Sequence, residues 1–412
     1  MTAETAAARL AKRGEFQVVA LVSAAHMVGH FQQMVLPPLF PFLKARLNIG
    51  FVELGLALTV YAVATILAQL PVAWLADRFG SRRLLIAGLV LGGAALASIG
   101  LVRSYRWLLF AVALNGVANA VYHPADYAIL AARVVPARIG RAFSIHTFAG
   151  FLGTAVAPPA MLLLAPAIGP WMALFAAGLI GPVVALPLFC ARRLDHAPRR
   201  PPAPRRRDDA RSGGASVWTP AILALSVFFM LLSLSGNGLS NFSVVALMNA
   251  YGDPFAIANW ALTAYLMLTA FGVLAGGFVA DMTERHAEVA AASFAVNAAL
   301  ALAIGLFDLG TALLIAVMGL SGFLSGVIMP SRDMLVRAVA PADAVGRAFG
   351  IVTVGLSIGG AIGPMLFGWI MDHGMPRWVF GATAVFMLLT VATAMLGERQ
   401  TSRRRALVLP AE

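Results

Sequence analysis

The chain has 412 residues, of which 60% are hydrophobic and only 12% are charged, and its mean hydropathy is +0.85. A soluble globular domain carries about twice that fraction of charged residues. The composition excludes a water-soluble enzyme, a fibrous protein and a disordered chain, and it predicts a protein with many membrane-spanning helices. An outer-membrane barrel is also excluded, because barrel strands alternate in polarity and do not run apolar for about twenty residues.

The formal net charge is +12. Such basicity is typical of nucleic-acid-binding proteins, but here the arginines stand in short clusters between apolar runs. Clusters of this kind are typical of cytoplasmic membrane loops. We therefore expect the lipid bilayer, and no nucleic acid, as a partner. The single cysteine, Cys190, excludes a disulfide framework and a cysteine-rich metal site, and we expect neither a metal nor a cofactor.

Twelve apolar runs along the chain predict twelve membrane-spanning helices. The first run follows a short basic segment and is too long for the apolar core of a signal peptide, so we interpret it as a retained span. The predicted spans are 16–43, 51–76, 84–102, 107–132, 142–166, 169–190, 217–248, 257–280, 289–308, 311–336, 347–371 and 376–396.

The spans fall into two groups of six, separated by a segment rich in arginine, proline and glycine, which predicts a flexible linker. Lysine and arginine are concentrated at the termini, in this linker and in alternate loops. Because positively charged loops stay on the cytoplasmic side, both termini are predicted to be cytoplasmic. The predicted organisation is an N-terminal six-helix bundle at 1–190, a cytoplasmic linker at 191–216, a C-terminal six-helix bundle at 217–397 and a cytoplasmic tail at 398–412.

The two halves repeat one another at a fixed offset of 206 residues. The shift places Gly140-Arg141-Ala142-Phe143 on Gly346-Arg347-Ala348-Phe349, and Pro124 on Pro330. An alanine-rich apolar background does not explain the Gly-Arg-Ala-Phe match. Two similar six-helix halves predict a transporter whose halves rock about a site at their interface.

The loop after the second span reads Ala73-x3-Asp77-Arg78-Phe79-Gly80-Ser81-Arg82-Arg83, and a degenerate echo, Gly277-x3-Asp281, follows the eighth span. An acid at a helix end and arginines on a tight turn can join neighbouring helix ends by charge-assisted hydrogen bonds. The loop resembles the cytoplasmic signature Gly-x3-Asp-Arg-x-Gly-Arg-Arg of the major facilitator superfamily, although Ala73 replaces the first glycine and Ser81 one basic residue. The resemblance implies an all-α membrane protein of two pseudo-symmetric bundles, which we expect as a monomer in a bacterial inner membrane.

Two further stretches resemble one branch of that superfamily, the fosmidomycin-resistance-like exporters. His26 precedes the run Leu36-Pro37-Pro38-Leu39-Phe40-Pro41, and the fourth span carries Tyr122-His123-Pro124 where the branch has an aromatic residue, histidine and proline. The branch typically has His-x3-Asp in its first span, whereas this chain has His26-x3-His30. An imidazole replaces a carboxylate, so the coupling mechanism of the branch does not transfer directly.

Glycine and proline recur in the fifth and eleventh spans and resemble the glycine–proline signature of drug–proton antiporters. This pattern predicts a close-packing, bendable helix face, and ordinary helix packing explains it equally well. The residues concerned are Gly153, Pro158, Gly359, Gly363 and Pro364.

Polar residues inside predicted spans are costly and mark candidate functional positions. They form stripes at helical spacing on the first, fourth and seventh spans, which line the central cavity in the family that the chain resembles. Hydrogen bonding between helices is the alternative explanation. His30 or His123 is the predicted proton-responsive group, because histidine titrates nearest neutrality, and His146 is interpreted as a packing residue. The predicted substrate-binding or proton-coupling residues are His26, His30, Gln33, Asn115, Asn119, His123, Asn237 and Asn241.

Asp126 and Arg332 occupy equivalent positions under the 206-residue offset and carry opposite charges. We predict that they pair across the two halves in the outward-open state and separate in the inward-open state. The alternative is local pairing, of Asp126 with Arg82, Arg83 or Arg141 and of Arg332 with Asp333. The predicted residues of the cytoplasmic gate and loop motif are Asp77, Arg78, Gly80, Arg82, Arg83, Asp126, Arg141, Asp281, Arg332, Asp333 and Arg347.

No His-Glu-x-x-His, Gly-x-Ser-x-Gly or Walker motif is present, so the chain predicts neither an enzyme nor an ATP-driven pump. The predicted function is secondary active transport, with proton-coupled efflux by antiport of a small polar or anionic metabolite or drug. A siderophore-like or phosphonate-like molecule fits this description. The alternatives are a proton-coupled importer of an organic acid and, from another class, a transport-dead membrane sensor.

Overall fold

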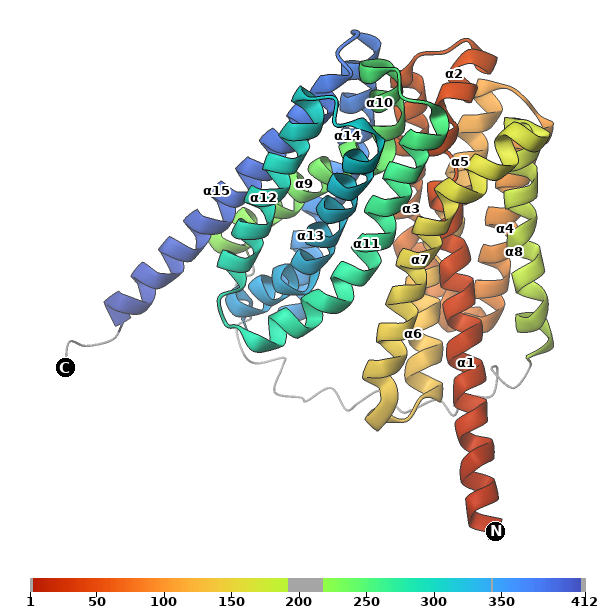
Figure 1. Ribbon diagram of the computed structural model, residues 1–412. Coiled ribbons are helices and arrows are strands. Elements are labelled where there is room, and N and C mark those ends of the chain that lie inside the picture. The colour runs from red at the N-terminus through yellow and green to blue at the C-terminus, as the bar shows by residue number, and fades with distance from the viewer. Residues whose placement is uncertain (1–2, 192–217, 342–343, 409–412) are drawn as a thin grey trace. The chain divides into compact units, whose positions relative to one another are not determined.

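The computed structural model describes residues 3–191, 218–341 and 344–408, and these residues are entirely helical apart from turns and short connections. The bounds of the helices follow in chain order (Figure 1). They are α1 (Ala3–Met34), α2 (Phe40–Leu47), α3 (Phe51–Phe79), α4 (Ser81–Leu101), α5 (Tyr105–Asn119), α6 (Tyr122–Arg133), α7 (Pro136–Ile168), α8 (Pro170–Cys190), α9 (Pro220–Asn237), α10 (Ser243–Tyr251), α11 (Phe255–Met282), α12 (His286–Leu306), α13 (Gly310–Val339), α14 (Val345–Asp372) and α15 (Arg377–Val408).

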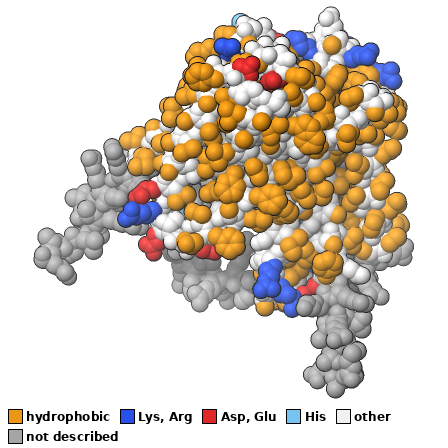
Figure 2. Space-filling view, in the orientation of Figure 1, with side chains coloured by type: hydrophobic (Ala, Val, Ile, Leu, Met, Phe, Trp, Pro, Cys, Tyr) orange, Lys and Arg blue, Asp and Glu red, His pale blue; other side chains and the backbone are white. Residues whose placement is uncertain are grey.

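Twelve helical stretches within these described residues are long and apolar enough to cross a membrane, and each coincides with one predicted span. Large hydrophobic side chains remain exposed on them: Leu67, Leu70 and Phe278 are each more than two-thirds exposed. On the face shown in Figure 2, hydrophobic side chains cover the broad middle, while charged side chains gather toward the ends. A surface of this kind suits hydrocarbon, because lipid tails solvate the side chains that water does not.

The chain forms two compact units rather than two exact sequence halves. The first contains α1 to α8 except for the start of α3, and the second contains α9 to α15 together with Gly50–Thr59. This segment joins the second unit because its backbone packs on α14: an added Cβ on Gly55 would lie 2.2 Å from the carbonyl oxygen of Pro364. The domain boundaries predicted at 1–190 and 217–397 therefore differ from the compact units at this point.

Three spans are interrupted where the sequence disfavours a regular helix. The first breaks at the 3-10 turn Pro37–Leu39, because prolines there cannot donate backbone hydrogen bonds. The fourth breaks at residues 120–121, between α5 and α6, and α6 begins two residues before Pro124, whereas the equivalent Pro330 lies inside the continuous helix α13. The seventh contains the π-helical turn Gly238–Phe242, a feature often found at functional sites.

The predicted glycine positions are places of close helix packing. An added Cβ on Gly153 of α7 would lie 2.1 Å from the carbonyl oxygen of Met27 in α1. In the second unit, a Cβ on Gly359 of α14 would lie 2.4 Å from the carbonyl oxygen of Met230 in α9. Backbones therefore approach where only glycine fits, as small residues at membrane interfaces allow.

The described residues include little of the predicted linker and most of the predicted tail. Residues 192–216 of the linker lie outside the described residues. The tail predicted from residue 398 continues α15 as one helix to Val408 (Figure 1), while residues 409–412 are not described.

Candidate functional site

The first unit brings four histidines and an aspartate together from three helices. We call this group the histidine cluster: His26 and His30 of α1, His123 and Asp126 of α6, and His146 of α7. The ring of His26 stacks on that of His146 with centroids 3.9 Å apart, and it lies 4.6 Å from that of His30 and 5.1 Å from that of His123. Residues 120 positions apart in the chain thus form one contiguous polar site.

Helical spacing and two glycines place these side chains. His26 and His30 are four residues apart, so they lie on one face of α1. Gly150 of α7 faces them, and an added Cβ there would lie 2.7 Å from the ring of His26 and 3.1 Å from that of His30. Together with the close approach at Gly153, this lets α1 and α7 lie near enough for both imidazoles to reach across.

The cluster leads from an accessible edge to a fully enclosed end. His123 is exposed and His30 is half-buried, whereas Asp126 and His146 are completely buried. His26, which is 3% exposed, lies between them. The histidines therefore connect the exposed ring of His123 to the enclosed carboxylate of Asp126.

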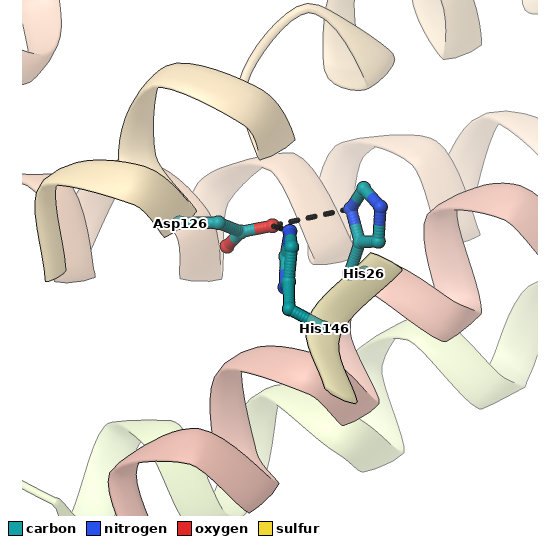
Figure 3. A group of neighbouring side chains, drawn as sticks. All are labelled: His26, Asp126 and His146. Atoms are coloured by element: carbon teal, nitrogen blue, oxygen red, sulfur yellow. Dashed lines mark ion pairs between the residues drawn. The ribbon is translucent and has the colours of Figure 1, made fainter. Parts of the chain in front are cut away.

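The enclosed end lacks hydrogen bonds. The Oδ2 atom of Asp126 lies 3.3 Å from Nδ1 of His26 and 3.7 Å from Nε2 of His146 (Figure 3). Neither pair forms a hydrogen bond, and both carboxylate oxygens and both ring nitrogens of His146 are buried without a partner among the described residues. His30 differs, since its Nδ1 lies 3.3 Å from the hydroxyl of Thr154. Unpaired buried polar atoms are costly and need a specific explanation.

The loop motif joins the end of α3 to the start of α4. Gly80 has a φ of +90°, a conformation that side chains disfavour. Arg82 is buried and donates to the carbonyl oxygens of Leu188 and Phe189 at 2.8 and 3.0 Å, which joins the start of α4 to the end of α8. Arg78 lies over the ring of Trp74. The side chain of Asp77 lies outside the described part of the structure.

A family model for the Major Facilitator Superfamily matches residues 22–255 and 223–410. The chain belongs to the Major Facilitator Superfamily. It is therefore a multi-pass membrane transporter and not an enzyme, as the sequence predicts.

Relatives and solved structures agree with this assignment. The chain is 24% identical over 411 residues to the fosmidomycin resistance protein of Escherichia coli K12, covering 97% of each chain. It is 24% identical over 352 residues to the multidrug resistance protein MdtH of Escherichia coli SMS-3-5, covering 80% of this chain and 82% of the relative. A bacterial homolog of the human lysosomal transporter Spinster, in an inward-facing and occupied conformation, has the same fold with a TM-score of 0.78, 16% identity and coverage of 94% and 97%. This major facilitator resembles the fosmidomycin-resistance branch.

Several positions in this major facilitator differ from the sequence interpretation. Asp126 lies within the histidine cluster, where it faces the imidazoles of His26 and His146 and forms no ion pair with Arg82, Arg83 or Arg141 among the described residues. His146 is isolated in the sequence but not in space, because α7 packs on α1. Burial of a carboxylate among imidazoles depends on that crossing, which helical spacing within α6 does not reveal.

The structure also gives the cluster ligand atoms that the sequence did not predict. His26, Asp126 and His146 each offer one possible metal-ligand atom, and these atoms all lie within 4.8 Å of one another. The expectation of no metal site considered only cysteine content and contiguous motifs. Three ligands on three separate helices leave no such motif, and only the fold brings them together.

Two neighbouring glutamines of α1 lie in different surroundings. Gln33 is exposed, whereas Gln32 is buried and its amide lies against Gly92 of α4 and Gly181 of α8. Asn115 of α5 is buried beside the same Gly92, and Asn119 is half-buried at the end of α5. Asn115 thus groups with Gln32 and not with the histidines.

In the second unit, the two asparagines of the seventh span are linked to each other and to the helix backbone by hydrogen bonds. Nδ2 of Asn241 donates to Oδ1 of Asn237 at 2.8 Å, and Nδ2 of Asn237 donates to the carbonyl oxygen of Ser233 at 2.8 Å. Gly363 of α14 packs against Asn237, which directly precedes the π-helical turn, and Asn241 lies within that turn. These residues form a second polar surface, within the second unit.

A polar group centred on Asn297, a residue that the sequence interpretation missed, links α12 to α13. Asn297 donates to Ser325 at 2.8 Å, and the hydroxyl of Ser321 donates to Oδ1 of Asn297. Asn297 is fully buried. Ser321 and Ser325 follow the polar spacing of the tenth span, but the sequence interpretation did not include Asn297, which stands alone in the ninth span.

The remaining charged residues of the predicted gate pair locally or stand at the surface. The Nε atom of Arg332 lies 3.2 Å from Oδ1 of Asp333, which confirms the local pairing considered for this arginine. Its guanidinium also lies 5.1 Å above the ring of Phe229. The exposed members are Arg83, Arg141, Asp281 and Arg347.

Proposed function

We propose that this protein is a secondary active transporter that exports a small polar or anionic metabolite or drug, in exchange for protons, across the inner membrane of a bacterium. It works by alternating access, as a monomer in the lipid bilayer. The observation that carries this proposal is the histidine cluster. Its ionisable side chains come from the first, fourth and fifth spans and extend from an exposed residue to fully buried ones. Ionisable groups at such positions mark ion and substrate pathways.

The proposed direction of transport and the proposed substrate class are supported by the relatives and by the polar residues of the first unit. Two of them are named for resistance to fosmidomycin and to multiple drugs, which supports export. The polar residues of the first unit are richer in imidazole and amide groups than in aromatic rings, which favours a hydrogen-bonding or anionic substrate, such as a phosphonate or a siderophore-like molecule, over a lipophilic cation. The arginine-rich ends support cytoplasmic termini.

Within the cluster, His30 and His123 are the proposed proton-coupling residues. They form its accessible edge, and the ionisable groups that face them are His26 on α1, Tyr122, Asp126 and Tyr127 on α6, and His146 on α7. A proton accepted at this edge changes the charge next to the buried carboxylate, and so it biases the packing of α1, α6 and α7.

The test is transport by the purified protein in proteoliposomes, with labelled fosmidomycin as the first probe. Further candidates come from a thermal-shift screen, because a binder stabilises the folded state by mass action. Inverted membrane vesicles whose interior is made acidic should take up the exported compound, because protons leave the vesicle in exchange for it. A proton-coupled importer would instead release the compound from such vesicles.

The variants His30→Gln and His123→Gln should abolish gradient-driven transport and leave counterflow exchange measurable, because exchange needs no net proton movement. His373→Ala, at an exposed histidine outside the cluster, is the control and should transport normally. Full gradient-driven transport by both cluster variants would place coupling elsewhere.

A further inference from the structure

The enclosed end of the histidine cluster has the spacing of a metal site rather than of hydrogen-bonded partners. A hydrogen bond between an imidazole and a carboxylate spans about 2.7–2.9 Å. The two separations from Oδ2 of Asp126, 3.3 Å to His26 and 3.7 Å to His146, are longer than that. Two ligands bound to one zinc ion, each about 2.0–2.1 Å from it in tetrahedral geometry, are separated by about 3.4 Å. Both separations from Oδ2 are close to that value, and all three possible ligand atoms lie within 4.8 Å of one another.

The polar atoms at this end also lack any other partner. Nδ1 of His26, both carboxylate oxygens of Asp126 and both nitrogens of His146 are buried and make no hydrogen bond among the described residues. One cation satisfies a lone pair on each of the three side chains at once, and its charge compensates the buried carboxylate. No single proton can do this for three groups.

The surroundings supply an approach and a route to the site. His123 is exposed and His30 is half-buried, and both rings lie beside that of His26. An ion that enters at His123 exchanges water for imidazole before it reaches Asp126. The rings of His26 and His146 are inclined by 28°, so binding requires one of them to turn about χ2, which is a soft torsion for histidine.

We propose that His26, Asp126 and His146 form a binding site for a divalent transition-metal ion of the zinc class. Two imidazoles and one carboxylate suit zinc, cobalt or nickel, whereas magnesium and calcium prefer oxygen ligands alone. The rings of His30 and His123 lie beside His26, so either could supply a fourth ligand. This inference goes beyond the proposed export, because it concerns binding at equilibrium and holds for any transported substrate.

The test is metal binding to the full chain, purified without a histidine tag, stripped with a chelator and held in lipid nanodiscs. Cobalt(II) should bind one ion per chain and give the intense visible absorption of a tetrahedral site, and zinc should displace it. His146→Ala and Asp126→Asn should each weaken zinc binding, measured by calorimetry, at least tenfold. His373→Ala, a histidine outside the cluster, should leave it unchanged.

A second measurement uses the unaltered protein, so its result does not depend on whether the variants fold. X-ray absorption at the zinc edge should show a nitrogen and oxygen shell at about 2.0–2.1 Å with the outer-shell scattering of imidazole. A shell of water alone, a sulfur ligand from Cys190, or unchanged affinity in correctly folded His146→Ala and Asp126→Asn would overturn the proposal. Transport by the chelator-treated protein is measured in parallel, so failure to bind metal is distinguished from failure to export.

Discussion

Asp253, in the connection between α10 and α11, is a carboxylate whose environment disfavours its charge. Burial raises the pKa of Asp253, and the negative charge of Asp308 raises it further. The folded protein therefore binds a proton here more tightly than the unfolded chain does. Stability from this group is fully present below the ordinary pKa of an aspartate and is lost as the pH rises through the raised pKa of the folded state.

The substitution Asp308→Asn should reduce the stability that is lost as the pH rises through the pKa of Asp253. The substitution removes the second cause of the raised pKa of Asp253, while its side-chain oxygen can still accept the backbone N–H of Gly310. The thermal midpoints of the variant and the original protein should agree at acid pH, and the variant should be more stable at neutral pH. Midpoints measured from pH 4 to 8 that remain parallel would contradict the coupling of the two carboxylates.

At the scale of elements, the crossing of α1 and α7 decides whether the histidine cluster exists. Gly150→Ala places a methyl group 2.7 Å from the ring of His26, so the helices must separate or the imidazole must move. Overpacking of this kind costs about 1–3 kcal/mol. Gly140→Ala, in the same helix with nothing within 4 Å of the added Cβ, is the matched control and should be neutral or slightly stabilising.

Unfolding of both variants in a mild detergent, followed by circular dichroism, measures the difference. We also expect Gly150→Ala, but not Gly140→Ala, to weaken metal binding at the cluster. Equal stability of the two variants would show that α1 and α7 tolerate a wider separation.

The start of α3 depends on a carboxylate from the end of α14. The two oxygens of Asp372 accept the backbone N–H groups of Phe51 and Val52, each at 2.8 Å, and Glu53 accepts that of Gly50 at 2.9 Å. A carboxylate at a helix N-terminus satisfies free donors and complements the helix dipole. This contact, together with the packing of Gly55 on Pro364, holds Gly50–Thr59 in the second unit.

Asp372→Ala should therefore destabilise the second unit by about 0.5–2 kcal/mol, the usual cost of losing a helix cap. Hydrogen exchange at Phe51 and Val52 should accelerate, while exchange in α4, within the first unit, stays unchanged. Uniform acceleration along the chain would show a global effect instead of a lost cap.

At the scale of the whole molecule, the proposed pairing of Asp126 with Arg332 can be tested by exchanging their charges. In their own units, Asp126 lies among imidazoles and Arg332 lies beside Asp333. Because Asp126 is completely buried, Asp126→Arg introduces a large cation into an enclosed site and should reduce stability and transport. We therefore expect the double variant with Arg332→Asp to be no closer to the original than Asp126→Arg alone.

Labelling of single cysteines at the cytoplasmic ends of the spans reports the balance between inward-open and outward-open forms. Recovery of that balance in the double variant would support the pairing across the halves. A coupling of this kind is typically about 1–3 kcal/mol, which is large enough to change the labelling rates severalfold.

The sequence by itself determined the twelve spans, the repeat at 206 residues and the family, because these depend on local properties. Hydropathy over about twenty residues fixes a span whatever its neighbours are. The turn at Gly80 and the positions of His26, His30 and His123 in their spans also followed from local patterns. Likewise, Asn237 and Asn241 are four residues apart, so their hydrogen bond depends on a single helical turn.

Only the tertiary structure decided which polar residues meet. His146 joins Asp126 because Gly150 and Gly153 let α7 approach α1, and the spacing within one helix carries no information about its neighbour. Gln32 is the buried glutamine of α1 because α4 and α8 offer glycines on that side of the helix. The start of α3 joins the second unit because Asp372 lies 320 residues away in sequence but within hydrogen-bonding distance in space. Such contacts are set by how helices cross, and a one-dimensional pattern does not record the crossing.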